Sequence, residues 1–158
     1  MSKHIMIGKK TISENAPTYI VAELSANHNQ VLEEALALIK SAKEAGADAV
    51  KIQTYTPDTL TIRCDSNLFK IENNSIWDGK FLYDLYEEAY TPWEWHKELM
   101  DFAKEQELDF FSSPFDKTAV NFLEELEVPA YKIASFELID LPLLEYVAAT
   151  GKPIILST

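Results

Sequence analysis

The sequence has few of the residues that cross-link chains or bind zinc. Its 158 residues include one cysteine, Cys64, and three histidines. A single cysteine excludes an internal disulfide and suits a reducing cytoplasm, where we expect the protein to work. One cysteine and scattered histidines also argue against a structural zinc site.

Long apolar runs, positive charge and glycine are also scarce. No apolar run approaches the ~20 residues of a membrane-spanning helix, and the opening stretch MSKHIMIGKK lacks the apolar centre of a signal peptide. The net charge of −12 disfavours nucleic acid and anionic membranes as partners. A small anionic substrate would therefore need a local positive pocket. A lysine within an apolar strand is a candidate to supply that positive charge.

Five short apolar runs end in polar residues and are rich in β-branched or aromatic residues. These features are typical of buried parallel strands. The runs are YIVAELS (19–25), DAVKIQT (48–54), LDFFSSP (108–114), AYKIAS (130–135) and PIILST (153–158).

Helix signals separate these runs. Apolar residues at helical spacing lie between Asn29, the expected N-cap, and Gly46, the expected C-cap. TPWE (91–94) has the pattern of a capping box that opens a helix ending near Gln106. Two more helices are expected after the N-cap residues Asp116 and Asp140.

Strand and helix alternate in the way that builds a parallel sheet. No glycine-rich loop follows the first run, so we favour a (β/α) barrel over a doubly wound sheet. A complete eight-stranded barrel takes ~250 residues. We therefore interpret residues 1–158 as the N-terminal part of a barrel, with about five βα units and the later strands absent. A hairpin at 6–12 could close its floor.

One connection, residues 56–90, is long enough to be a lid or binding loop. Its aromatic side chains could stack on a sugar or pack the loop down, and the sequence favours neither. They are Phe69, Trp77, Phe81, Tyr83, Tyr86 and Tyr90.

In a barrel the carboxyl ends of the strands meet at one mouth, where polar side chains converge. Glu23 shares a strand face with Val21, and Asn27 and His28 follow it. The Glu23 carboxylate is either half of an ion pair with Lys51 or an acid/base group. His28 is an acid/base or ligand candidate, and a structural role is equally open.

Two lysines interrupt apolar strands at equivalent places. Lys51 points the same way as Gln53, and Lys132 repeats the arrangement two strands later. Burying one lysine is costly without an anion, and two in an acidic chain indicate a phosphate or carboxylate cradle.

Further polar candidates lie at the other strand ends. The hydroxyl donors are Ser112, Ser113, Ser135, Ser157 and Thr158. Glu137 is a second mouth carboxylate or a solvated loop residue. His4 and His96 are expected at the surface.

Several ordered motifs resemble the sialic acid synthase family, and the pseudaminic acid synthase branch most. They are IVAELSANHNQ, AKEAGADAVKIQTYTPDTLTI, WDGKFLYDLYEEAYTPWEWH, SSPFD, FDKTAVNFLE, VPAYKIAS and KPIILST. The resemblance implies a (β/α)8 barrel followed by a small antifreeze-like domain, absent here, in an enzyme expected to be a homodimer.

The resemblance also implies the chemistry. Phosphoenolpyruvate condenses with an N-acetylated amino sugar, here 2,4-diacetamido-2,4,6-trideoxy-altrose, giving pseudaminic acid and phosphate. A divalent metal, Mn²⁺ or Mg²⁺, assists, with ligands expected outside this chain. The implied phosphoenolpyruvate ligands are Lys51, Lys132, Ser113, Ser135 and Ser157, while Gln53 contacts the sugar and Glu23 lies near the metal.

Two departures from the family pattern stand out. Many relatives have AEIGINHNG where this chain has AELSANHNQ, so Ser25 and Gln30 replace glycines. SSPF replaces STPF, which keeps a hydroxyl at Ser113.

Other functions stay open at this point. They are synthesis of N-acetylneuraminate or legionaminate, a Schiff-base aldolase using a strand lysine, and an inactive anion-binding fragment.

Overall fold

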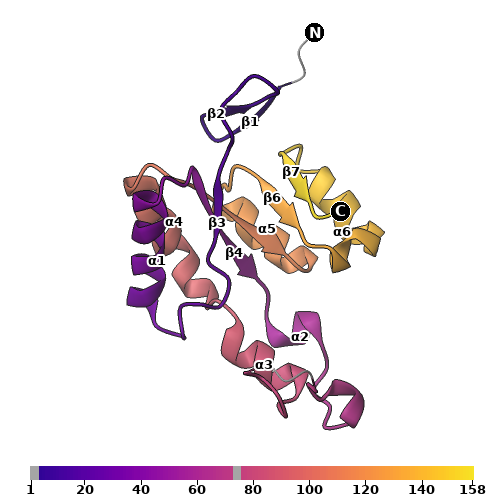
Figure 1. The fold of residues 1–158 in the computed structure, drawn as a ribbon. Helices are drawn as coiled ribbons and strands as arrows, with labels where there is room; N and C mark the ends of the chain where they lie inside the picture. Colours follow the sequence, from indigo (N-terminus) through magenta and orange to yellow (C-terminus); the bar gives the residue numbers. More distant parts are fainter. Residues whose placement is uncertain (1–3, 73–75) are drawn as a thin grey trace.

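The protein is built on a parallel sheet of five strands, seen here in a computed structural model that describes residues 4–72 and 76–158 (Figure 1). The strands lie side by side in chain order, which confirms each predicted run. They are β3 (Val21–Glu23), β4 (Ala49–Thr54), β5 (Asp109–Pro114), β6 (Tyr131–Ile133) and β7 (Ile154–Leu156).

Four helices connect neighbouring strands and cover one face of the sheet. They are α1 (Leu32–Glu44), α4 (His96–Glu105), α5 (Lys117–Glu125) and α6 (Leu141–Ala148). Because right-handed crossovers each add the next strand on the same side, the helices collect on one face and the sheet curls away from them. The coarse prediction of a βα-repeat with a curled parallel sheet is confirmed.

The predicted N-terminal caps are right for two helices and wrong for two, and Gly46 ends α1 as predicted, with a φ of 87°. Asp116 accepts hydrogen bonds from two amides at the start of α5, and Asp140 accepts one from Leu143. Asn29 does not cap α1, because its own φ is 49° and the helix begins only after Val31. TPWE forms no capping box, since a 3₁₀ turn, η2 (Trp93–Trp95), precedes α4.

Alternation along β4 separates the core from the site. Val50, Ile52 and Thr54 are buried on the helix-covered face. Lys51 and Gln53 point to the opposite, concave face, where the sheet is less covered. The apolar core therefore lies between the sheet and the helices. The polar candidate residues of β4 lie on the concave face.

The predicted hairpin is present, as β1 (Ile5–Ile7) paired antiparallel with β2 (Lys10–Ile12). It is held near the amino ends of β4 and β5, since Lys10 Nζ lies 2.9 Å from the Asp48 carboxylate. Tyr19 also donates a hydrogen bond to Asp109 at 2.7 Å. The hairpin thus lies at the opposite end of the sheet from the strand ends that carry the candidate site.

The long connection between β4 and η2 forms a lobe beyond the carboxyl ends of the strands (Figure 1). It contains α2 (Pro57–Leu60), a 3₁₀ turn η1 (Asn67–Phe69) and α3 (Leu82–Ala89). The Arg63 guanidinium lies 3.9 Å from the centre of the Tyr83 ring, and Tyr86 packs edge-on against Tyr55. Tyr83 and Tyr86 of the long connection therefore pack against other side chains of the protein.

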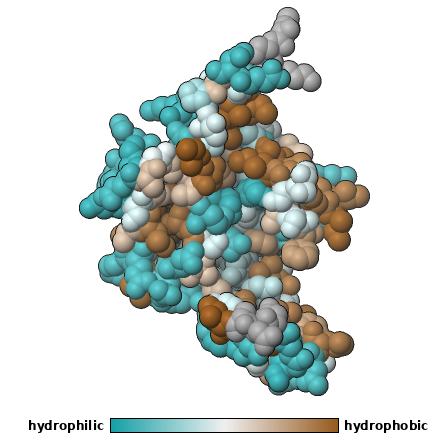
Figure 2. Space-filling view, in the orientation of Figure 1, coloured by the Kyte–Doolittle hydropathy of each residue, from teal (hydrophilic) through white to brown (hydrophobic). Residues whose placement is uncertain are grey.

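Apolar side chains are exposed around the last strand, on the right in Figure 2. They belong to the 3₁₀ turn η3 (Phe136–Ile139), α6 and β7, and are Phe136, Ile139, Leu141 and Leu156. Within the described residues, no helix is both long and apolar enough to cross a membrane.

Gly8 at the hairpin turn is expected to be intolerant of a side chain. Its φ is 54°, and a Cβ there would overlap the Asp109 carboxylate. Gly8→Ala should lower the free energy of unfolding by roughly 2–3 kcal/mol, from left-handed strain and overpacking together. Urea denaturation measures this. Gly46→Ala is the control, because Gly46 has a φ of 87° in open space and should lose only about 1 kcal/mol; equal losses would contradict the clash.

Candidate active site

The register of β3 and β4 brings Glu23 directly opposite Lys51 at the carboxyl ends of the strands. The two side chains form an ion pair through Glu23 Oε2 and Lys51 Nζ. The lysine side chain is 12% exposed and the carboxylate 39%, so the acid shields a buried ammonium and still reaches solvent. The ion pair is thus formed, and an acid/base role for Glu23 stays a prediction.

The other oxygen of Glu23 is held by its own loop. Glu23 Oε1 accepts hydrogen bonds from the Ser25 amide at 3.1 Å and the Ser25 hydroxyl at 3.0 Å. Both carboxylate oxygens are therefore engaged, and the group has a fixed orientation. The sequence reading missed Ser25, although its place two residues after Glu23 was the available signal.

Lys132 approaches the same face from β6. Its Nζ donates to the Ile133 carbonyl at 2.7 Å and to the Ser157 hydroxyl. Burial, with the charge of Lys132 second, lowers the pKa of Lys51 to about 8, and the adjacent Glu23 carboxylate opposes this. Burial lowers the pKa of Lys132 too. Two ammonium groups thus share one concave region and repel each other, which a bound anion would relieve.

Glu137 supplies an acceptor beside this pair. It lies on η3, just past β6, and burial raises the pKa of its carboxyl group. Its Oε2 is buried and has no hydrogen-bond partner among the described residues. Buried polar atoms are normally paired, so this oxygen is free for a ligand or a proton.

Gln53 and Ser113 are opposite each other in the β4–β5 register, on the face that carries Lys51. Ser113 is 1% exposed. Ser135 and Thr158 are exposed, and Ser135 makes no side-chain cap bond at the start of η3. Asn27 is also exposed, and its amide donates to the Leu24 carbonyl at 3.0 Å.

The structure corrects two sequence predictions on the helix-covered face. Ser112 points away from the lysines and donates to the Ile52 carbonyl at 3.1 Å, because it alternates with Ser113. Its Oγ lies 2.6 Å from Thr54 Oγ1. His96, expected at the surface, is 0% exposed. Its Nδ1 lies 3.1 Å from the Pro92 carbonyl and so carries the proton, which leaves Nε2 to accept from Thr54 at 2.8 Å.

His28 is buried at 2% exposure, with both ring nitrogens bonded inside the protein. Nδ1 accepts from the Gln30 amide at 3.1 Å, so Nε2 donates to Thr91 at 3.3 Å. Burial lowers its pKa, and its ring packs edge-on against Trp95. This geometry ties the loop after β3 to the segment before α4, and a substrate contact by His28 stays a prediction.

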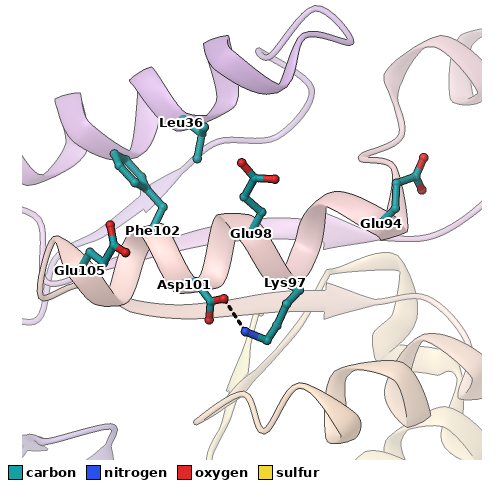
Figure 3. Close-up of a pocket in the computed structure, with 7 residues that line it drawn as sticks. All are labelled: Leu36, Glu94, Lys97, Glu98, Asp101, Phe102 and Glu105. Atoms are coloured by element: carbon teal, nitrogen blue, oxygen red, sulfur yellow. Dashed lines mark hydrogen bonds and ion pairs between the residues drawn. The ribbon is translucent and has the colours of Figure 1, made fainter.

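A separate surface hollow lies on the outer layer between α1 and α4 (Figure 3). Its lining is mostly acidic, and its one lysine, Lys97, pairs with Asp101. Such a surface suits no anion, and it lies on the helix layer, not on the concave face that carries Lys51. The lining residues are Leu36, Glu94, Lys97, Glu98, Asp101, Phe102 and Glu105.

A sequence model of the NeuB family matches residues 38–158. The chain belongs to the NeuB family. It is 52% identical to the pseudaminic acid synthase of Helicobacter pylori over 142 residues, covering 90% of this chain and 42% of the relative. It is 34% identical to the N,N'-diacetyllegionaminic acid synthase of Legionella pneumophila over 151 residues, covering 96% and 42%.

The crystal structure of an N-acetylneuraminic acid synthetase from Leptospira borgpetersenii in complex with citrate has the same fold. The TM-score is 0.81 at 31% identity, covering 99% of this chain and 50% of that one. This NeuB-family chain therefore spans about half or less of the length of the relatives it matches.

The divalent metal implied by the resemblance finds no binding cluster in the part of the chain that the structure describes. No group of three His, Cys, Asp or Glu side chains gathers there. Glu23 is the carboxylate expected near that metal, and its oxygens are taken by Lys51 and Ser25.

The burial of His96 predicts that the stability of the protein depends on pH. Burial lowers the pKa of His96 from 6.5 to about 4. Between these values the unfolded chain binds more protons, so the free energy of unfolding should fall as the pH falls from 6.5 to 4, by on the order of 3 kcal/mol. Urea denaturation across this range measures it. His96→Gln should show a weaker dependence, and exposed His4→Gln an unchanged one; identical curves for all three proteins would contradict the assignment.

Proposed function

We propose that the full-length protein condenses phosphoenolpyruvate with an open-chain N-acetylated amino sugar, giving a 2-keto sugar acid and phosphate. The observation that carries the proposal is the meeting of Lys51, Lys132 and the unpaired Glu137 oxygen on one concave face. Two cations suit a carboxylate and a phosphate held together. The free carboxylate suits a proton transfer beside them.

The amino sugar we propose is 2,4-diacetamido-2,4,6-trideoxy-altrose, with pseudaminic acid as product. The support is the 52% identity to the Helicobacter pylori pseudaminic acid synthase, against 34% to the legionaminic acid enzyme. Gln53 and the loop that carries Asn27 and His28 are the proposed sugar side. Ser113, Ser135 and Ser157 are proposed as neutral donors to phosphoenolpyruvate.

In the proposed reaction, the enol carbon of phosphoenolpyruvate attacks the aldehyde carbon, and the aldehyde oxygen gains a proton. Positive charge develops at the carbon that bears the phosphate, and water adds there. Glu137 or Glu23 takes a proton from that water. The intermediate then breaks its carbon–oxygen bond to release phosphate. Lys51 and Lys132 hold the carboxylate and phosphate charges in position throughout.

We further propose that the curled sheet is the first part of a closed (β/α)8 barrel in a homodimer working in the cytoplasm. The strand order and the 50% coverage of the Leptospira chain support the barrel. The exposed apolar surface around β7 is where a following βα unit would pack. A divalent metal with ligands outside residues 1–158 and an antifreeze-like domain belong to this proposal, and the 158-residue chain alone should show no synthase activity with added Mn²⁺.

The two lysines should dominate the binding of phosphoenolpyruvate. Lys51→Ala or Lys132→Ala in the full-length protein should weaken binding by about 2–5 kcal/mol, because each substitution removes a desolvated charge partner. Isothermal titration calorimetry measures this. Lys10→Ala is the matched control, since Lys10 pairs with Asp48 at the amino ends of the strands. Unchanged affinity in both site variants would contradict the cradle.

The position of bond cleavage can be read by running the reaction in ¹⁸O-water. Water adds to carbon and the carbon–oxygen bond breaks, so the sugar acid should carry the label and the phosphate should not. Mass spectrometry of both products decides the point. Label in the phosphate would mean that water attacks phosphorus, and the proposed sequence of steps would be wrong.

A Schiff-base aldolase is the second candidate, because the lowered pKa of Lys51 would favour a nucleophilic amine. The ion pair with Glu23 argues against it by favouring the ammonium form. Borohydride treatment in the presence of substrate distinguishes the two. Covalent trapping on Lys51 or Lys132 would support the aldolase, and no adduct is expected for the condensation.

A further inference from the structure

The loop after β3 places three side chains where the backbone favours glycine. Ser25 has a φ of 45°, Asn29 a φ of 49° and Gln30 a φ of 57°. A left-handed backbone is disfavoured for residues that carry a Cβ. The chain therefore keeps a strained backbone at Ser25 and Gln30 that glycine would relieve.

Each of the two side chains makes hydrogen bonds that glycine cannot make. The Ser25 hydroxyl donates to Glu23 Oε1 at 3.0 Å. The side-chain amide of Gln30 donates, through Nε2, to the carbonyls of Glu88, at 2.9 Å, and Tyr90, at 2.5 Å. The first bond acts on the site carboxylate, and the second ties the loop to the end of α3. The two residues thus share backbone strain and differ in what they hold.

The hydroxyl bond determines how Glu23 meets Lys51. With Oε1 occupied by the amide and hydroxyl of Ser25, only Oε2 faces the lysine. A carboxylate released from Ser25 could turn both oxygens to the ammonium group and occupy the hydrogens that an incoming anion needs. Glu23 is part-exposed, so its orientation depends on such bonds more than on packing.

We propose that Ser25 is a positioning residue that holds the Glu23 carboxylate turned away from full pairing with Lys51. This inference rests on the proposed function, in which Lys51 binds an anion and Glu23 lies at the reacting atoms. Other charged groups bear on the carboxylate less directly. Lys132 on β6 faces Lys51, and Glu137 on η3 faces Lys132.

The experiment compares three variants of the full-length protein. Ser25→Gly relieves the backbone strain and removes the hydroxyl, and Ser25→Ala removes the hydroxyl and keeps the strain. Gln30→Gly relieves equivalent strain without touching Glu23. Because one hydrogen bond to a charged group is lost, both Ser25 variants should lower kcat/KM by about tenfold. They should also move its acid limb to lower pH, because the released carboxylate pairs more fully with the Lys51 ammonium group.

The pH profile separates positioning from a general effect on folding. Gln30→Gly should leave the acid limb where it is, and Ser25→Thr, which keeps a hydroxyl, should bring the limb back toward the parent's. An unmoved limb in both Ser25→Gly and Ser25→Ala would overturn the inference. A limb that moves equally in Gln30→Gly would overturn it too, because loop strain alone would then explain the change.

A titration without substrate makes the inference independent of the proposed reaction. Carbon-13 NMR of the Glu23 side-chain carboxylate should show a lower titration midpoint in Ser25→Gly than in the parent or in Gln30→Gly, because fuller pairing with Lys51 favours the ionised carboxylate. If the protein shows no synthase activity and the midpoint still falls, the proposed function fails while the Ser25 contact stands. If activity is present and the midpoint is unchanged, the inference fails alone.

Discussion

The burial of one ammonium group is the constraint on which this structure's polar face depends. Lys51 lies on β4 between the buried residues Val50 and Ile52, and its side chain is largely removed from water. A charge in that place must be paired or lose its proton. The parallel register of β3 and β4 provides the partner, because it sets Glu23 level with Lys51. The register of the two strands therefore determines which charged groups of the site are paired.

Because side chains alternate along a strand, adjacent residues face either the concave site or the helix-covered core. Gln53 and Ser113 face the lysines. Thr54, one residue after Gln53, and Ser112, one residue before Ser113, lie on the other face, where their hydroxyl oxygens are 2.6 Å apart. Thr54 also binds the buried His96 of α4. The helix-side network fixes the relative height of β4 and β5 at their carboxyl ends. Because β4 and β5 are fixed relative to each other, the side chains on their concave face are fixed as well. The hydrogen bonds of the core thus help to set the geometry of the site.

Features that follow from the periodicity of the sequence could be predicted. Features that depend on contacts between residues distant in the sequence could not. Apolar runs predicted the five strands, and the shared parity of Lys51 and Gln53 placed them on one face. The surface assignment of His96 was wrong because a polar residue at a helix start can turn inward to a strand hydroxyl. The Asn29 cap was wrong because two successive left-handed residues delay the helix. The unpaired Glu137 oxygen depends on how η3 folds over β6, which no local pattern encodes.

The division between strands and loops bears on how related enzymes could differ in substrate. Under the proposed function, the anion is held by lysines anchored in the sheet, where any shift would disturb the core. The sugar would instead meet the loop after β3 and the lobe between β4 and η2, which are joined by Gln30 and His28. Relatives named for different sugar acids each align over most of this chain, covering 90% and 96% of it. Selection among sugars is therefore best sought in the loops, where side chains can change without the cost of repacking a sheet.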